Sequence, residues 1–174
     1  MKYIVRFIVV TFFLFVSTHA LTEEKVVVLN LKFVLNNSKA GKSAQDFLQK
    51  KFSDDQKKFA DEEAQLKKEE SDLLANKANI SKEEYKKKSE ALRSKVAEYQ
   101  NKRRTALDTI TRQRADARKK LLDTVNPILN KYVDENNISL VIDSKNVLAG
   151  KNDLNITEII IDKLNKELPS LNLK

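Results

Sequence analysis

The chain has 174 residues, with 33 lysines and arginines against 25 aspartates and glutamates, one histidine and no cysteine. The absence of cysteine excludes thiol nucleophiles, disulfides and cysteine zinc sites. The single histidine, His19, lies in a segment that we expect to be removed, which also argues against acid–base catalysis by histidine.

The first twenty residues predict a secretory signal peptide. Lys2 and Arg6 precede the apolar run Phe7–Val16, and Thr18-His19-Ala20 fits the small-x-small cleavage rule. We therefore expect cleavage after Ala20 and export, with a bacterial periplasm as the simplest destination. The alternative is an uncleaved anchor, but the run is shorter than the ~20 residues that a membrane-spanning helix needs.

A β-branched run follows, because Val26–Leu31 reads VVVLNL and predicts a buried strand. The next segment, Asn36–Ser43 (NNSKAGKS), resembles a phosphate-binding loop between a strand and a helix. That motif requires glycine where this chain has Asn36, and no apolar strand ending in aspartate follows early enough to complete a nucleotide site. We therefore interpret Gly41 as a hinge, the flexible joint between the strand region and a helical arm.

Residues 41–126 predict a long helical hairpin, because helix-forming residues fill the segment and no proline interrupts it. Ser81 and Glu84 have capping-box spacing, which places the hairpin tip near residues 76–81. Apolar residues recur every seven positions, and the spacing is typical of a coiled-coil seam. The two series and a companion set are Phe52, Phe59, Leu66, Leu73; Tyr85, Leu92, Tyr99, Ala106; and Val96, Arg103, Ile110, Ala117.

The predicted seam is thin. The companion positions on the first limb are polar (Gln56, Glu63 and Glu70), and Arg103 lies in the seam of the second limb. Such a hairpin buries little apolar area, so we expect an arm that bends easily and a core that lies elsewhere.

That core is expected to come from the two ends of the chain, residues 21–40 and 127–174. Ser139–Asp143 and Asn146–Ala149 predict two strands joined by a tight turn, and Gly150 closes the second. The predicted fold class is therefore α+β, with a small β-rich association body and a long antiparallel α-helical coiled-coil hairpin arm.

The last helix is predicted to begin with Thr157 as its N-cap and to end before Pro169. A body of roughly 60 residues is marginal alone, because it buries too little apolar surface. Its strands are apolar on both faces and no disulfide is available, so we expect subunits to associate through it. The candidate residues of this association body are Val26, Val28, Leu140, Ile142, Val147, Ile160 and Leu164.

Positive charge is concentrated on the second limb of the arm. Between Arg93 and Lys120 there are ten basic and three acidic residues, whereas Asp46–Glu90 holds 11 basic and 12 acidic residues. A solvated helix face is one interpretation, but a field of one sign also attracts oppositely charged ligands. The candidate binding residues of this surface are Arg93, Lys95, Lys102, Arg103, Arg104, Arg112, Arg114 and Arg118.

Acidic polypeptides or anionic lipids, including lipopolysaccharide, fit this surface better than nucleic acid, because few aromatic residues on that limb can stack on bases. Paired carboxylates such as Glu62 and Glu63 lie on exposed, charged helices, where nothing desolvates them for catalysis. We therefore expect no enzymatic activity, no metal and no cofactor.

From about residue 25 to residue 168 the chain resembles the Skp (OmpH-like) family of periplasmic chaperones. One carrying stretch is Lys25–Gln45, KVVVLNLKFVLNNSKAGKSAQ, a strand followed by a linker into the first arm helix. The other is Asn130–Lys166, which contains LVID (Leu140–Asp143), NVLA (Asn146–Ala149) and the lead into the last helix. The arm itself is less specific, since any charged coiled coil would resemble it.

The resemblance implies a homotrimer whose body is built from all three chains, with three arms projecting around a cavity. It also implies that unfolded outer-membrane β-barrel proteins are held there after export, without ATP. This chain departs from that pattern in the near-neutral, lysine-rich first limb. The alternative function is a non-catalytic coiled-coil adaptor that binds one folded envelope partner or anionic lipid.

Overall fold

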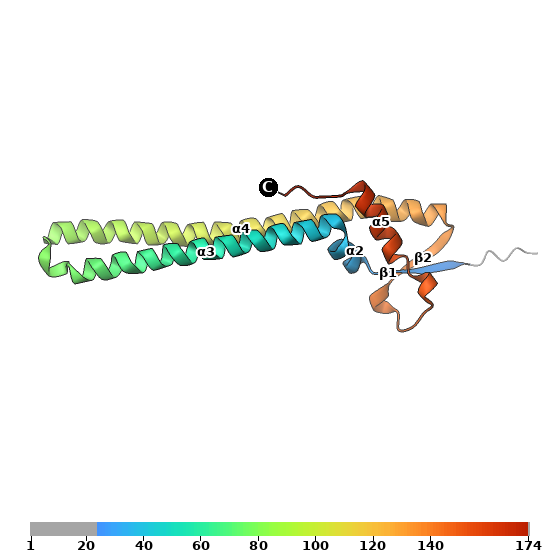
Figure 1. Ribbon diagram of the computed structural model, residues 1–174, viewed down its shortest axis with the longest axis horizontal. Coiled ribbons are helices and arrows are strands. Elements are labelled where there is room, and N and C mark those ends of the chain that lie inside the picture. Colours follow the sequence, from blue (N-terminus) through green and yellow to red (C-terminus); the bar gives the residue numbers. More distant parts are fainter. Residues whose placement is uncertain (1–23, 174) are drawn as a thin grey trace, which may run out of the picture.

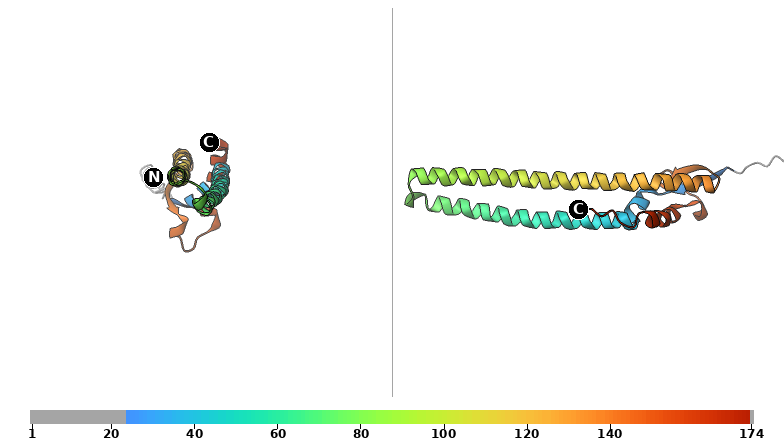
Figure 2. Two further views of the ribbon diagram at one scale, coloured as in Figure 1. Left: turned by 90° about the vertical axis from the view of Figure 1, so that its left-hand side faces the viewer. Right: turned by 90° about the horizontal axis from the view of Figure 1, so that it is seen from above.

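The computed structural model describes residues 24–173, and the predicted signal peptide lies outside the described residues. One end is a small body and the other is a long arm of two antiparallel helices, α3 and α4, lying side by side (Figures 1 and 2). The fold class predicted from the sequence is confirmed. The elements are β1 (Lys25–Leu29), α2 (Leu31–Asn37), α3 (Lys39–Ala75), α4 (Lys82–Glu135), β2 (Ile138–Asp143) and α5 (Thr157–Glu167), with short 3-10 turns between some of them.

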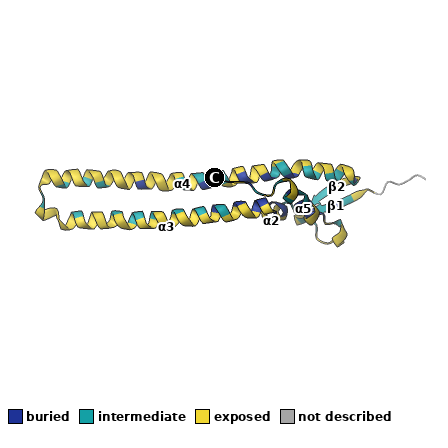
Figure 3. Cartoon of the chain, turned by 45° about the horizontal axis from the view of Figure 1, so that its top comes forward, coloured by how far each residue is buried: buried dark blue, intermediate teal, exposed yellow. Residues whose placement is uncertain are grey.

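The hydrophobic core lies in the body and at the adjoining ends of the arm helices. Figure 3 shows buried residues gathered at this end, while most of the arm is exposed. Val34 of α2, Val125 of α4, and Ile160 and Leu164 of α5 are fully buried in this core. The described residues of the two chain ends therefore form one packed unit, to which both arm helices are attached.

The sheet of the body has two parallel strands, β1 and β2, joined through the whole arm. The predicted third strand, Asn146–Ala149, is wrong. Asp143 ends β2 by accepting a hydrogen bond from the backbone N–H of Lys145 (3.0 Å), and the chain turns there into a 3-10 turn. Leu148 is then fully exposed, and the chain returns to the sheet only at Asn155, which bridges to Val28.

The start of α5 also differs from the prediction, since Thr157 is the first helical residue and Ile156 occupies the N-cap position. The hydroxyl of Thr157 is buried and accepts a hydrogen bond from the backbone N–H of Asn30 (2.9 Å). The side chain of Asn155 accepts from the N–H of Thr157 (3.0 Å). Thr157 therefore ties the end of β1 to α5 and does not cap its own helix.

The base of the arm is fixed by Ser38 and Gly41. Ser38 is the N-cap of α3 and accepts a hydrogen bond from the N–H of Gly41 (3.1 Å), while Asn165 of α5 accepts from the N–H of Lys39 (2.6 Å). Gly41 is buried inside the first turn of α3 and has no positive φ. A side chain there would overlap the backbone carbonyl of Leu35 in α2.

This geometry corrects the reason given for Gly41. The sequence indicated a flexible joint between strand and helix, but the residue is part of a helix, and α2 intervenes between it and β1. Glycine is required because two backbone segments approach closely, not because the chain needs an unusual conformation.

Helix α4 continues through Pro127, which the sequence placed at the boundary between arm and body, and ends at Glu135. Proline disfavours a helix interior because it lacks the backbone N–H and its ring crowds the preceding turn. The apolar face on both sides of Pro127 packs against the body, with Val125 fully buried and Leu129 and Tyr132 partly buried. This tertiary packing outweighs the local preference. Among the described residues, no helix is long and apolar enough to cross a membrane.

Substitution of the two glycines tests the close approach at the arm base. Gly41→Ala should lower the free energy of unfolding by about 2 kcal/mol, because the clash is with backbone and cannot be relieved by a rotamer change. Gly150→Ala is the matched control: its nearest atoms would lie 3.8 Å away, and stability should change by less than about 0.5 kcal/mol. Thermal unfolding at equal protein concentration measures both. Equal stability of the two variants would contradict the packing argument.

Candidate binding surface

The arm helices are held together by few buried side chains. Between Leu48 of α3 and Ile110 of α4, going out to the tip and back, Tyr99 is the one buried residue. Its ring lies edge-on to Phe59, with centroids 6.0 Å apart, and its hydroxyl donates to Glu63 (3.2 Å). The other members of the two heptad series are mostly half-buried. The expected seam is present, and it is as thin as the sequence predicted.

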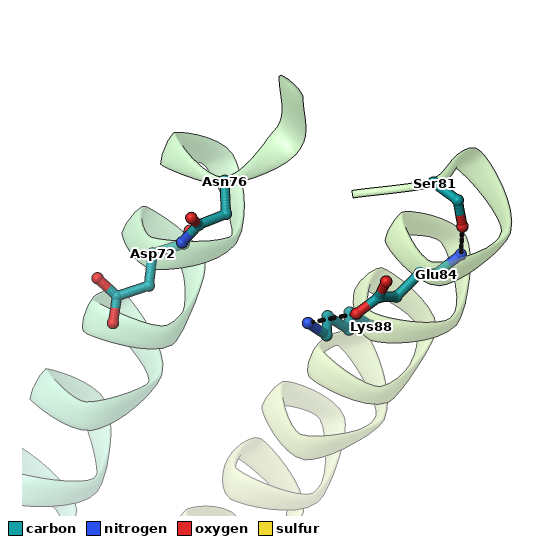
Figure 4. Close-up of polar contacts among 5 residues, drawn as sticks. All are labelled: Asp72, Asn76, Ser81, Glu84 and Lys88. Atoms are coloured by element: carbon teal, nitrogen blue, oxygen red, sulfur yellow. Dashed lines mark hydrogen bonds and ion pairs between the residues drawn. The ribbon is translucent and has the colours of Figure 1, made fainter. Parts of the chain in front are cut away.

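The turn of the hairpin occupies residues 76–81, the segment in which the sequence places the tip. Asn76 caps α3, its side-chain amide donating to the carbonyl of Asp72 (2.9 Å), and the hydroxyl of Ser81 accepts from the N–H of Glu84 (3.1 Å) (Figure 4). The carboxylate of Glu84 pairs with Lys88 at 2.9 Å. Ser81 therefore makes one of the two hydrogen bonds of the predicted capping box. The carboxylate of Glu84 contacts Lys88 instead of making the other.

One face of the arm carries a groove of about 870 Å³ between α3 and α4 near the tip. Apolar side chains from both helices form most of its lining, and Arg93, Arg103 and Arg104 of α4 also line it. Several of these apolar residues are substantially exposed, including Leu74 (57%) and Leu107 (47%). The apolar and aromatic lining residues are Leu66, Leu73, Leu74, Tyr85, Leu92, Val96, Tyr99 and Leu107.

The groove continues toward the body. A second hollow shares Glu63, Tyr99, Arg103 and Leu107 with the first, and it reaches Phe52. A third hollow begins at Phe52 and is lined by Arg114 and Arg118 as well as by small residues at the arm base. The three together form one surface along the arm, which we call the groove face.

Five of the eight basic residues singled out in the sequence line the groove face: Arg93, Arg103, Arg104, Arg114 and Arg118. All five are exposed, and within the described part of the chain none forms an ion pair with a carboxylate. Arg104 donates a hydrogen bond to the side chain of Asn101 (3.2 Å). The positive charge of this face is therefore available to a ligand.

The remaining basic residues lie differently. Lys95 donates both to Oε1 (2.8 Å) and to Oε2 (2.7 Å) of Glu69, and Lys102 contacts Glu62 (3.4 Å) and Glu98 (3.0 Å). Hydrogen bonds to Glu98 and Glu62 raise the pKa of Lys102. Lys95 and Lys102 are seven residues apart on one side of α4, which we call the ion-pair face.

The lysines of the ion-pair face hold the two arm helices together, because they pair with carboxylates of α3. A separate groove on this side is lined by Lys102 and Thr105 and shares no residue with the groove near the tip. Arg112 is exposed and lines none of these grooves. The sequence joined eight residues in one basic surface, whereas the structure separates them by helix face.

An ion pair also lies beside the buried ring. Lys67 contacts Glu63 at 2.7 Å, and its hydrogen bond and charge, followed by the Tyr99 hydroxyl, hold the pKa of Glu63 below its usual value. Both partners are exposed, so the pair adds little to stability. Because the pKa of Glu63 is lowered on folding, this small contribution is present above the ordinary glutamate pKa and is lost as the pH falls through the lowered value.

The body residues singled out in the sequence fall into two groups. Ile160 and Leu164 are fully buried within this chain, so they cannot contact a second chain directly. Val26, Val28, Ile142 and Val147 are half-buried, and Leu140 is 53% exposed.

The partly exposed strand residues share one side of the sheet. Val26 is the register partner of Leu140, and Val28 is the partner of Ile142, whereas the alternate residues Val27 and Leu29 face the core. Because side chains alternate along a strand, these four residues form a second apolar face that the core does not cover.

Chemically, the described residues offer surfaces for binding. No group of three or more potential metal ligands is present among them. The apolar floor of the groove face is the feature that sequence reasoning missed. Val96 was assigned to the seam. Leu74 and Leu107 directly follow the heptad residues Leu73 and Ala106, so neighbouring pairs of apolar residues were the sequence signal that could have revealed this floor.

Comparison with known proteins assigns this architecture to a family. A family model described as "Outer membrane protein (OmpH-like)" matches residues 25–164, which include both arm helices, both strands and most of α5. The chain belongs to the OmpH-like family. The suspected relationship is thereby confirmed.

A solved structure from Caulobacter crescentus CB15, described as a candidate outer membrane chaperone (OmpH-like), has a similar fold. Its TM-score is 0.80 at 17% sequence identity, and the match covers 91% of this chain and 94% of that chain. A search of curated proteins found no match. At this identity the structural likeness establishes the OmpH-like fold, with its hairpin arm and small body, across nearly the whole length.

Removing the Tyr99 ring should loosen the OmpH-like arm without unfolding the body. Tyr99→Ala removes the buried side chain between Leu48 and Ile110, while the body core contains no contribution from it. Hydrogen exchange should become at least about tenfold faster in the outer arm and stay unchanged in β1 and α5, corresponding to a local loss of about 1.4 kcal/mol or more.

Tyr99→Phe is the matched control, because it keeps the ring against Phe59 and loses only the hydrogen bond to Glu63. Its exchange should stay within about threefold of the parent, as expected for one partly exposed hydrogen bond. If the alanine variant exchanged as slowly as the phenylalanine variant, the ring would not hold the arm together.

Proposed function

We propose that this OmpH-like protein is an ATP-independent holdase chaperone. It acts in the periplasm after removal of residues 1–20, and it binds unfolded outer-membrane β-barrel proteins and prevents their aggregation. The groove face carries the proposal, because a long apolar surface stands open beside unpaired arginines. Family membership and the description of the Caulobacter relative as an outer membrane chaperone support it.

The physical basis is many weak contacts spread over an open surface. The groove is open rather than enclosed, so it offers a client partial burial along its length and no deep site for one group. Linking several such contacts raises the overall affinity through effective concentration. The unpaired arginines attract acidic segments at long range, and salt screens that attraction beyond about 10 Å. Binding and release therefore need no nucleotide.

We also propose that three chains associate through the body. The sheet face formed by Val26, Val28, Leu140 and Ile142 supports this, because four adjacent apolar side chains are only partly covered within one chain. Exposed apolar faces of this kind usually mark an interface. A trimer would place three arms around one space and multiply the contacts that each client makes.

The holdase proposal is tested by mixing the protein with a barrel protein diluted from urea and recording light scattering. At a twofold excess of trimer, without ATP and at low salt, aggregation should fall by at least about fivefold, as expected when many weak contacts act together. Raising the salt to about 1 M should weaken the effect, because the Debye length falls to about 3 Å.

Added ATP should change nothing, and an exported protein of unrelated fold is the control. Unchanged aggregation at low salt would exclude the holdase function. Selective capture of one folded envelope protein, with no effect on several unfolded barrels, would favour the adaptor function instead.

The trimer proposal is tested by Leu140→Asp, which places a charge in the uncovered face of the sheet. Multi-angle light scattering should give a trimer mass for the parent and a monomer mass for the variant, because an unpaired charge is costly to bury in an interface. Thr105→Asp on the arm is the control and should remain trimeric. A trimeric Leu140→Asp protein would place the interface elsewhere.

A further inference from the structure

We propose that the groove face of one arm binds a single extended client segment about one transmembrane β-strand long, with apolar side chains in the groove and carboxylates on the arginines. This inference rests on the proposed function and adds which segment is bound, on which face and in what conformation.

The floor of the groove face favours an apolar partner. Leu74 and Leu107 are about half-exposed, and Val96 (36%) and Phe52 (39%) continue the series toward the body. The two arm helices alone leave a large part of the apolar surface of these side chains in water. Covering them with the side chains of a client removes apolar surface from water along the whole groove.

The arginines beside the floor repeat at a fixed interval. Arg93 and Arg104 are eleven residues apart, as are Arg103 and Arg114, and eleven residues are close to three helical turns. Each pair therefore lies on one side of α4 and is separated by about 16 Å along its axis. An extended chain covers that distance in about five residues.

The length of α4 that carries these two pairs matches a barrel strand. From Arg93 to Arg114 the helix rises about 31 Å, which about nine or ten extended residues would span. A transmembrane β-strand has about 9–11 residues, and its apolar and polar side chains alternate. One such strand, still unfolded, could lay its apolar side in the groove and keep its polar side in water.

Charge selects among such segments. On the α3 side of the groove, Lys67 is paired with Glu63, and Glu70 also lines the groove. The arginines of α4 form no ion pair among the described residues, although the charge of Arg103 helps to lower the pKa of Glu63. Acidic side chains at the edge of the client strand would supply carboxylate partners, and basic ones would be repelled. The ion-pair face cannot do the same, because Lys95 and Lys102 already contact glutamates of α3.

The test uses fluorescent peptides of about ten residues, the length of one barrel strand, with alternating leucine and polar residues. One carries glutamates at the polar positions, a second carries lysines there, and a third has the acidic composition in blocks without alternation. Fluorescence anisotropy against the full exported chain at low salt should show the alternating acidic peptide binding at least about tenfold more tightly than the other two.

Two variants locate the site. Arg93→Gln/Arg103→Gln/Arg104→Gln should weaken binding of the acidic peptide about tenfold, because three exposed charge contacts are lost. Lys95→Gln/Lys102→Gln is the control on the ion-pair face and should change binding less than about twofold. Circular dichroism checks that both variants keep the arm. Equal loss in both variants, or none in the first, would overturn the assignment of the face.

A photo-reactive residue at Leu107 should cross-link to the acidic peptide, and one at Thr105, on the other side of the helix, should not. Cross-links from Leu107 to a second copy of the chain would mean that the groove is an arm–arm interface and would overturn the proposal. Failure of all peptides to bind, while the parent still suppresses barrel aggregation, would also overturn it but leave the holdase function standing. Failure to suppress aggregation would remove the holdase function itself.

Discussion

The arm depends on how little its two helices bury between them. Beyond the base, the seam rests on Tyr99 packed against Phe59, on half-buried heptad residues and on ion pairs at the surface. A seam with more buried apolar residues would give a stiffer arm without an open groove. Because the α3 positions that face the seam include Gln56, Glu63 and Glu70, apolar side chains of α4 are left without partners. The same deficit that weakens the arm creates the groove face.

The two sides of the arm also differ in whether their basic residues are paired with carboxylates. Lysines on one side join α4 to carboxylates of α3, and arginines on the other stand unpaired beside the exposed apolar floor. The body holds the base of the arm in place. There, α2 approaches α3 so closely at Gly41 that no side chain fits, and Asn165 of α5 accepts a hydrogen bond from the start of α3. A weakly packed arm can therefore project from a firmly packed base.

Periodicity in the sequence was enough to predict the hairpin, its tip and its thin seam, because long helices obey local rules over many turns. The third strand was predicted wrongly, since Asn146–Ala149 has strand-like residues but no neighbour with which to pair. Thr157 looked like a cap and instead binds Asn30, 127 residues away. The groove face and the ion-pair face could not be distinguished from the sequence either, because the pairing of Lys95 with Glu69 depends on how α3 and α4 lie side by side.

Side-chain footprinting of the protein bound to a full-length unfolded barrel protein tests the central claim most directly. Hydroxyl radicals modify exposed side chains, so a bound client should protect Leu74, Val96 and Leu107 on the groove face. Thr105 on the other side of the arm should be modified as fast as in the free protein. Uniform protection around the arm, or protection confined to the ion-pair face, would contradict the account.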